Sequence, residues 1–424
     1  MPPINFSPSS FSINTSDLNQ QRIAILGAGG LGACAALELS QRGYKVDLFE
    51  EHSEPIKKAS YANEGKVHVG FIYAMDRSFH TAHQMLVGAV HFMEYLQRWV
   101  DVKPEEMIST PFYYLVQKGS LLNSQELNSH YQRCCQVYKE LSGGGKKKYL
   151  GLFDSLEARL LHKSRIDGIA NPEFTEDIFE TTEYSVEPRY IAEKLTQAIS
   201  SDPNINLFLD SKVEAVAKVG DRLKVIFRNA GIQIEEEYTD VVNSTWNGLL
   251  EIDRTMGIEP LGTWSHRYKF GNKLLIPLKE ADLPSCTMVL GPFGDIVNFR
   301  ERGAFMSWYP VGRTGWSEDY RPPEWDSMYS PEERMDVFQR SFEELKKRIP
   351  AAGNLKFPLE AVDPVGGDIL ALGNTEVDQS KSRFHERFEV GIRSFGNYHS
   401  VDTGKYTLIP YLAVKVADRL EGID

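Results

Sequence analysis

The residues best suited to chemistry are the glycines of a short motif near the start of the chain. Residues 27–32 read GAGGLG, which is the spacing G-x-G-x-x-G. Gly27 permits a tight turn, Gly29 lets a pyrophosphate approach the backbone, and Gly32 lets a helix pack closely on a sheet. Glu50, about twenty residues further on, can accept hydrogen bonds from ribose hydroxyls. Together they predict dinucleotide binding. The acid disfavours NADP, and the motif alone leaves NAD and FAD open.

The residues around this motif have the pattern of a strand, a helix and a second strand. Residues 23–26 are a short apolar run that predicts a buried parallel strand, and residues 33–42 repeat apolar side chains at helical intervals. Residues 46–49 predict the second strand, with Glu50 at its end. The helix N-terminus would then offer N–H groups and a partial positive charge to phosphates. This register is that of a Rossmann-like unit and argues against a fortuitous glycine-rich turn.

The composition indicates a soluble protein that is long enough for two domains. The chain has 424 residues, of which 42% are hydrophobic and 25% charged, as is ordinary for globular proteins. The net charge of −12 argues against a nucleic-acid partner, and no apolar run is long enough for a transmembrane segment. Residues 1–20, rich in Ser, Asn and Pro, predict a disordered lead-in without the pattern of a signal peptide.

Neither the cysteines nor the histidines have the spacing of a metal site. The four cysteines contain no C-x-x-C pair, which favours a reduced, cytoplasmic compartment. His80 and His83 lie three apart on a predicted helix, but no carboxylate or cysteine shares their spacing. The sequence therefore predicts a cytoplasmic protein without a metal.

A second polar segment, residues 60–73, becomes apolar along its length. Gly65 in this segment permits a close approach of the backbone. His68 is a candidate proton acceptor from a substrate hydroxyl or amine, and Tyr73 is a candidate for lining a substrate cavity. The alternative for both is a packed side chain in the core.

The remaining strand patterns fall into two groups. Residues 213–219 and 222–228 predict a hairpin, and residues 240–245 predict a buried strand that runs into a polar turn. Residues 396–405 predict a polar loop before an amphipathic helix. Strands of an antiparallel sheet are expected where apolar and polar residues alternate, over residues 273–277, 287–290, 295–299 and 304–309.

The order of these segments resembles that of the D-amino-acid-oxidase-like (DAO) superfamily of FAD-dependent oxidoreductases, over most of the chain. Residues 60–73 are similar to the N-S-G-V-I-H-x-G-I-Y-Y pattern of L-2-hydroxyglutarate oxidases. Residues 403–407, TGKYT, resemble the G-G-K-x-T-T loop near the flavin in glycerol-3-phosphate dehydrogenases. Trp246 departs from the superfamily, which usually has a glycine there. The resemblance implies FAD, held by Gly27, Gly29, Gly30, Leu31, Gly32, Glu50, Asn63, Gly65, Val213, Thr245, Gly404, Lys405, Tyr406 and Thr407.

The resemblance also implies an enzyme that oxidises a C–N or C–O bond of a small polar substrate, such as an amino acid or hydroxy acid, by hydride transfer to flavin. Substrates of the superfamily often carry a carboxylate, which an arginine fork suits. An NAD-dependent dehydrogenase and a non-catalytic FAD-binding module of a larger assembly are the alternatives. The candidate catalytic and substrate-binding residues are His68, Tyr73, Arg300, Arg313 and Tyr398.

The fold class expected from this resemblance is α/β (α+β overall), with two domains. A discontinuous Rossmann-like FAD-binding domain would comprise residues 21–72, 184–255 and 358–424. A mixed antiparallel-sheet domain that carries the substrate would comprise residues 73–183 and 256–357. The flavin would lie between them, as ligands at domain interfaces do.

Overall fold

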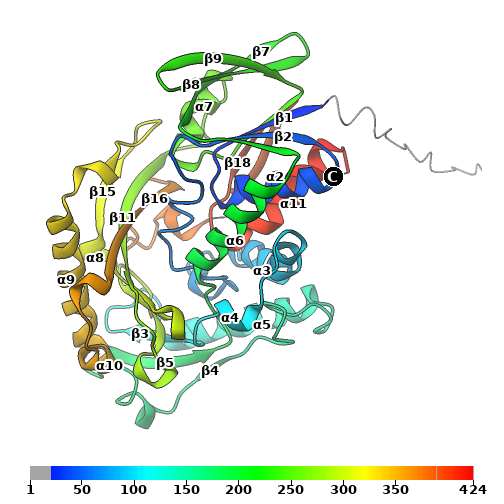
Figure 1. Ribbon diagram of the computed structural model, residues 1–424. Coiled ribbons are helices and arrows are strands. Elements are labelled where there is room, and N and C mark those ends of the chain that lie inside the picture. Colours follow the sequence, from blue (N-terminus) through cyan, green and yellow to red (C-terminus); the bar gives the residue numbers. More distant parts are fainter. Residues whose placement is uncertain (1–20, 388, 424) are drawn as a thin grey trace, which may run out of the picture.

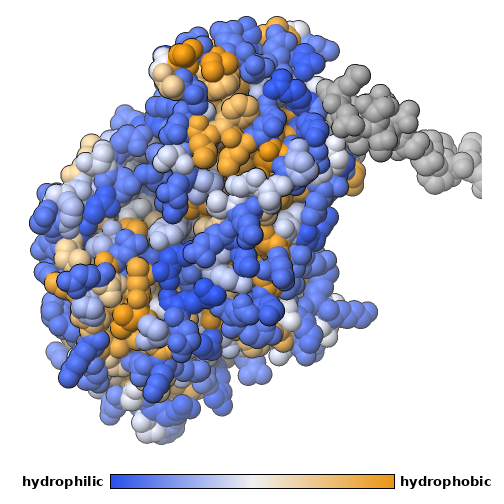
Figure 2. Space-filling view, in the orientation of Figure 1, coloured by the Kyte–Doolittle hydropathy of each residue, from blue (hydrophilic) through white to orange (hydrophobic). Residues whose placement is uncertain are grey.

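The computed structural model describes residues 21–387 and 389–423, so the lead-in expected over residues 1–20 lies outside the described part of the chain. Two lobes, each built on a large sheet, face one another (Figure 1). Hydrophilic residues cover most of the face seen in Figure 2, as the charged composition requires. Within the described residues no helix is both long and apolar enough to span a bilayer.

The first lobe is organised around a six-stranded sheet with the order β17-β18-β10-β1-β2-β6. All neighbouring strands are parallel except β17, which is antiparallel to β18. The strands come from three separate stretches of the chain, so this lobe is discontinuous in sequence. They are β1 (Arg22–Leu26), β2 (Lys45–Phe49), β6 (Ile205–Phe208), β10 (Asp240–Asn243), β17 (Gly391–Phe395) and β18 (Tyr398–Asp402).

Both faces of this sheet are covered, which explains the continuous apolar run in β1. Ile23 and Ile25 belong to the hydrophobic cluster on one face, whereas Ala24 and Leu26 belong to the cluster on the other. All four side chains are 0% exposed. Because successive side chains of a strand point to opposite faces, a strand buried on both sides needs an apolar residue at every position.

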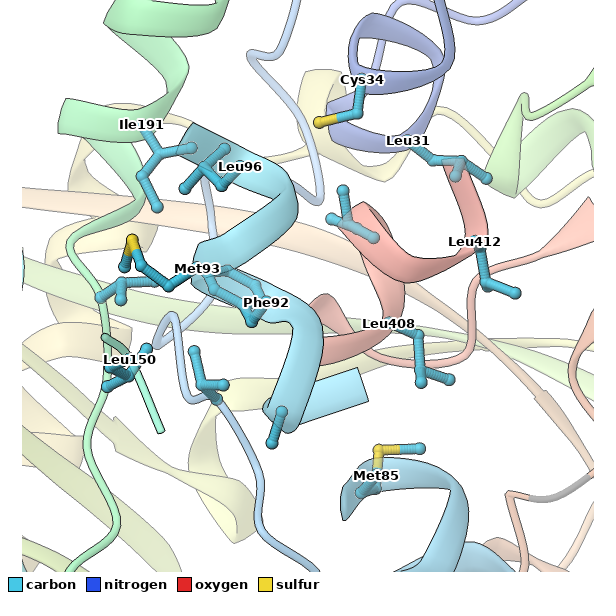
Figure 3. Packing of buried hydrophobic residues seen from close by; sticks show 14 of the residues in the cluster. Leu31, Cys34, Met85, Phe92, Met93, Leu96, Leu150, Ile191, Leu408 and Leu412 are labelled. Atoms are coloured by element: carbon cyan, nitrogen blue, oxygen red, sulfur yellow. The ribbon is translucent and has the colours of Figure 1, made fainter. Parts of the chain in front are cut away.

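Helices cover the first face. Figure 3 shows Cys34, Phe92, Ile191 and Leu412, each from a different helix, in one packed cluster. The first helix begins at Gly30, earlier than the sequence pattern predicts, because the last glycines of the motif already lie in its first turn. The covering helices are α2 (Gly30–Gln41), α3 (His80–Trp99), α6 (Pro188–Ser201) and α11 (Ile409–Leu420), with α5 (Ser124–Leu141) packed against α3.

A three-stranded antiparallel sheet and a short helix cover the other face. The predicted hairpin is confirmed, since β7 and β8 pair across a turn at Gly220, where φ is +63°. Such a φ favours glycine. These elements are β7 (Ser211–Val219), β8 (Arg222–Asn229), β9 (Ile232–Tyr238) and α7 (Leu249–Thr255).

The second lobe is built on a nine-stranded sheet in which β11 pairs with β14, β15 and β16. β16 falls in the range 358–424 that the sequence assigned to the FAD domain, but it pairs with β11 in this sheet along eleven residues. The strands are β3 (Phe112–Gln117), β4 (Ala158–Leu160), β5 (Thr175–Thr181), β11 (Trp264–Leu274), β12 (Ser285–Val289), β13 (Gly294–Asn298), β14 (Ala304–Trp308), β15 (Arg313–Ser317) and β16 (Val362–Leu372). Its helices are α4 (Pro104–Met107), α8 (Tyr309–Gly312), α9 (Pro331–Arg348) and α10 (Pro350–Asn354).

Candidate active site

A large cavity lies between the two lobes. It encloses about 1790 Å³ of empty space, its open mouth included. Clefts between two lobes are a preferred place for cofactors and substrates to bind. Its walls come from the glycine motif, the end of β2, residues 56–68, residues 244–248, β11, β16 and residues 403–406.

The glycine motif forms a cradle at one end of this cavity. Gly27 has a φ of +90°, and a Cβ on Gly32 would lie 1.9 Å from the carbonyl oxygen of Gly27. Only glycine therefore lets α2 come this close to the turn. Gly29 lines the cavity as the N-cap residue of α2, and the N–H of Gly30 donates to Ser60 Oγ at 2.9 Å. This turn and helix N-terminus fit a pyrophosphate.

Glu50 lines the same end of the cavity. Its carboxylate accepts hydrogen bonds from the backbone N–H groups of Ala28 at 3.1 Å and His52 at 3.0 Å. Burial raises the pKa of Glu50 to about 7, although these bonds act in the opposite direction. Val213 and Thr245 line the adjoining wall. An acceptor held in this position fits the ribose hydroxyls of a dinucleotide.

Asn63 shapes the loop that leads to His68. Its side-chain amide donates to the carbonyl oxygens of Ala59 at 2.8 Å and Ser60 at 2.9 Å, and its Oδ1 accepts from the N–H of Gly65 at 2.7 Å. Gly65 has a φ of +65°, and a Cβ there would lie 1.9 Å from a backbone oxygen. Asn63 lines the cavity and Gly65 lies behind it.

His68 reaches the cavity as a buried, neutral imidazole. Burial lowers its pKa well below the ordinary value, and the nearby charges of Lys405 and Lys66 act in the same direction. Among the described residues Nδ1 has no hydrogen-bond partner. The ring packs edge-on against Tyr73, with 5.5 Å between centroids, and the hydroxyl of Tyr73 also has no partner in this part of the chain. His68 is therefore suited to accept a proton.

The loop before α11 forms another wall. Gly404 has a φ of +62°, and its N–H donates to Asp402 Oδ1 at 2.8 Å. Burial and the charge of Arg387 lower the pKa of Lys405 to about 8, although Glu64 opposes them. Thr407 Oγ1 accepts from the N–H of His68 at 2.8 Å, which ties this loop to the preceding segment.

A face of β11 supplies cations that the sequence analysis missed. Arg267 and Lys269 occupy alternate positions of the strand and therefore share a face. Lys269 lines the cavity together with Arg387. The guanidinium groups of Arg267 and Arg387 lie 3.7 and 6.0 Å from the ring centroid of Phe384. The alternation of basic residues along 267–273 was the signal that could have identified this face.

Lys66 is a further buried cation at the cavity. Its Nζ contacts Thr287 Oγ1 and lies 3.2 Å from Asp295 Oδ1 and 4.1 Å from the ring centroid of Phe112. Burial lowers the pKa of Lys66, but the charges of Asp295 and Glu183 outweigh it, and the pKa is raised. Lys66 therefore stays charged, and its charge is already balanced.

Four residues predicted for catalysis or substrate binding, namely Tyr73, Arg300, Arg313 and Tyr398, are not among those that line the cavity. Arg300 donates to two backbone carbonyls at 2.7 and 2.9 Å, and Arg313 forms an ion pair with a glutamate at 2.7 Å. Tyr398 donates to Asp253 Oδ1 at 2.8 Å in a buried network of the first lobe. Tyr73 lies behind His68. These contacts give the arginines and Tyr398 partners within the protein, outside the set of cavity-lining residues.

Most of the residues predicted to hold the cofactor are brought together. Gly32, Gly65 and Thr407 lie directly behind the cavity wall, in contact with residues that line it. Those that line the cavity are Gly27, Gly29, Gly30, Leu31, Glu50, Asn63, Val213, Thr245, Gly404, Lys405 and Tyr406.

Curated relatives match parts of the chain. The FAD-dependent monooxygenase FPY4 of Fusarium mangiferae is 31% identical over 98 residues, which cover 23% of this chain and 26% of the relative. The tRNA 5-methylaminomethyl-2-thiouridine biosynthesis bifunctional protein MnmC of Campylobacter jejuni subsp. doylei is 47% identical over 55 residues, which cover 13% of this chain and 9% of the relative. The matches thus span about a quarter of these relatives' lengths or less.

Solved structures share the fold along nearly the whole chain. Glycine oxidase from Geobacillus kaustophilus superposes with a TM-score of 0.66 at 14% identity, covering 95% of both chains. L-alpha-glycerophosphate oxidase from Mycoplasma pneumoniae, solved with FAD bound, has a TM-score of 0.61 at 14% identity and covers 95% of this chain and 94% of that one. The family model "DAO: FAD dependent oxidoreductase" matches residues 22–359. The chain therefore belongs to the DAO family of FAD-dependent oxidoreductases, and its cofactor is FAD.

Proposed function

We propose that this enzyme oxidises a C–N or C–O bond of a small substrate that carries a carboxylate, such as an amino acid or a hydroxy acid. The observation that carries the proposal is the pair of buried guanidinium groups of Arg267 and Arg387, whose residues are 4% and 8% exposed. Arg267 donates to the hydroxyl of Tyr309 at 3.0 Å, and Arg387 donates to the carbonyl oxygen of Leu370 at 3.3 Å. Neither forms an ion pair with a carboxylate of the described chain.

Two buried cations that repel one another are costly without an anion. Burial and the charge of Arg267 lower the pKa of Arg387 to about 10. Asp402 acts on Arg387 only at a distance, and burial raises the pKa of Asp402 to about 6. A substrate carboxylate would neutralise the pair and accept planar, bidentate hydrogen bonds from guanidinium groups.

The rest of the site supplies the proton chemistry. FAD, when bound, accepts the hydride that leaves the substrate carbon. His68 is neutral, because its pKa is lowered by burial, and accepts the proton from the substrate amine or hydroxyl. Lys269 and Lys405 face Glu64, which balances part of their charge. In this arrangement Arg387 orients the substrate from the cavity wall, the nearby Arg267 adds positive charge, and His68 removes the substrate's proton.

An absorbance spectrum followed by anaerobic titration tests this proposal. We expect flavin bands that bleach with amino acids or hydroxy acids but not with the matching amino alcohols, amides or diols. Equal bleaching by the neutral counterparts would contradict the role of the carboxylate. Bleaching by phosphorylated polyols alone would mean that the anionic group of the substrate is a phosphate and not a carboxylate. Flavin that none of these compounds reduces would favour the non-catalytic module.

We also infer that the protein works in the cytoplasm without a nucleic-acid partner. The support is the set of four free cysteines and the net charge of −12. Cell fractionation and a filter-binding assay with RNA and DNA test these two inferences.

A further inference from the structure

We call the end of the cavity that holds the glycine motif and Glu50 the nucleotide end. A loop of the second lobe reaches across this end. This bridging segment, residues 318–328, connects β15 to α9. Arg321 lies within it and lines the cavity. Its Nη2 lies 2.6 Å from Glu51 Oε2, and its Nη1 lies 3.1 Å from Glu251 Oε2. Glu51 follows Glu50 at the end of β2, whereas Glu251 belongs to α7. One guanidinium thus joins both walls of the first lobe at this end.

The bridging segment has two more anchors on the first lobe. Lys58 Nζ, from the cavity wall, lies 2.8 Å from Asp326 Oδ2, and the hydroxyl of Tyr320 donates to Glu259 Oε2 at 2.7 Å. Asp326 also accepts from Arg334 Nη2 at 2.9 Å, inside the second lobe. The segment is therefore held in place within its own lobe, and it spans the nucleotide end of the cavity.

We propose that Arg321 is a positioning residue that retains FAD by closing the nucleotide end of the cavity. The side chain is 16% exposed, and Glu324, Glu51 and Glu251 surround its guanidinium. This cation is already neutralised, unlike the unpaired guanidinium groups of Arg267 and Arg387. Arg321 therefore holds the walls together around the cofactor and leaves the oxidation itself to the other end of the cavity.

The rate of FAD release tests the proposal without any substrate. We would follow the rise in free FAD fluorescence after dilution of the holoenzyme. R321Q should release FAD about tenfold faster, a change that corresponds to about 1.4 kcal/mol, and added FAD should restore its turnover. Salt screens ion pairs, so release from the unsubstituted protein should accelerate with potassium chloride more steeply than release from R321Q. R159Q is the matched control, because Arg159 pairs with Glu180 on the exposed surface of β4 and β5.

E251Q separates this proposal from direct binding of the FAD phosphates by Arg321. If Arg321 joins the walls, E251Q also speeds FAD release, because one wall is disconnected. If Arg321 binds phosphate, E251Q frees the guanidinium and slows release or leaves it unchanged, which would overturn the proposal. Unchanged release from a folded R321Q would overturn it as well. Should R321Q melt far below the unsubstituted protein, E251Q still decides the outcome. A failure to find a reducing substrate leaves this assay intact.

Discussion

The two ends of the cavity differ in the groups that they offer to a ligand. At the nucleotide end the backbone offers most of the groups for a ligand, since the glycine cradle and the N-terminus of α2 face the cavity. The guanidinium of Arg321 at this end is paired with carboxylates. At the proposed substrate end, near Arg387 and His68, side chains supply most of the groups for a ligand. Here Arg267 and Arg387 have no carboxylate partner in the described chain. Carboxylates of the protein balance the cation of the first end, whereas we propose that a substrate anion balances those of the second.

This difference predicts different responses to substitution. A change at the nucleotide end alters backbone geometry, so it should abolish cofactor binding or the fold. A change at the substrate end removes a charge or a proton acceptor, so it should alter kinetics while FAD stays bound.

Gly32→Ala should have the largest effect. The new Cβ would lie 1.9 Å from the carbonyl oxygen of Gly27, so α2 must move away from the turn. We expect protein purified without flavin absorbance and a free energy of unfolding lower by about 3 kcal/mol. Gly353→Ala is the control, because a Cβ there meets nothing within 4 Å. A yellow G32A with normal stability would show that the close packing of α2 is not needed.

His68→Asn should have the second largest effect. Loss of a general base typically lowers kcat by about 10²–10⁴-fold, and the flavin bands should be unchanged. The pKa of His68 lies well below 6.5, so activity should fall only when the pH drops far enough to protonate it. In H68N this acidic limb should disappear from the profile of kcat/KM against pH. An unchanged acidic limb would mean that another group takes the proton.

The lowered pKa of His68 also makes the stability of the protein depend on pH. The unfolded chain protonates His68 near its ordinary pKa of 6.5, whereas the folded protein resists protonation because the ring is buried. The stability contributed by neutral His68 is therefore present above pH 6.5 and lost as the pH falls below it. Urea unfolding at neutral and mildly acidic pH should show a smaller loss for H68N than for the unsubstituted protein.

Arg387→Gln should weaken substrate binding without loss of FAD. Removing a charged hydrogen-bond partner from a substrate carboxylate costs about 2–3 kcal/mol, so kcat/KM for the acid should fall about 30–150-fold. Arg313→Gln is a matched control, because Arg313 is paired with Glu376 outside the set of cavity-lining residues. Equal losses in both variants would contradict the selective role of Arg387.

The contrast between the two ends of the cavity also explains which parts of the site the sequence could predict. The glycine motif and Glu50 act through local geometry, which a run of about thirty residues encodes. The substrate end combines β11 with the loop that contains Arg387, and no local pattern links segments so far apart. Arg300 was a reasonable prediction because it follows a strand of the second sheet, but its guanidinium donates to the carbonyl oxygens of Ile108 and Ser109. Residue type and position near a strand end do not distinguish these two uses of an arginine.

Tyr398→Phe should have the smallest effect on activity. It tests directly whether a residue that the sequence placed in the site serves the fold instead. The hydroxyl of Tyr398 donates to Asp253 Oδ1 at 2.8 Å and accepts from Asn243 Nδ2 at 2.9 Å, within the core of the first lobe. Loss of this hydroxyl leaves buried polar groups short of a partner, so the free energy of unfolding should fall by about 1–3 kcal/mol. KM and kcat should stay unchanged, because the residue acts on the fold alone. A Y398F variant with normal stability but a raised KM would return Tyr398 to the substrate site, where the sequence first placed it.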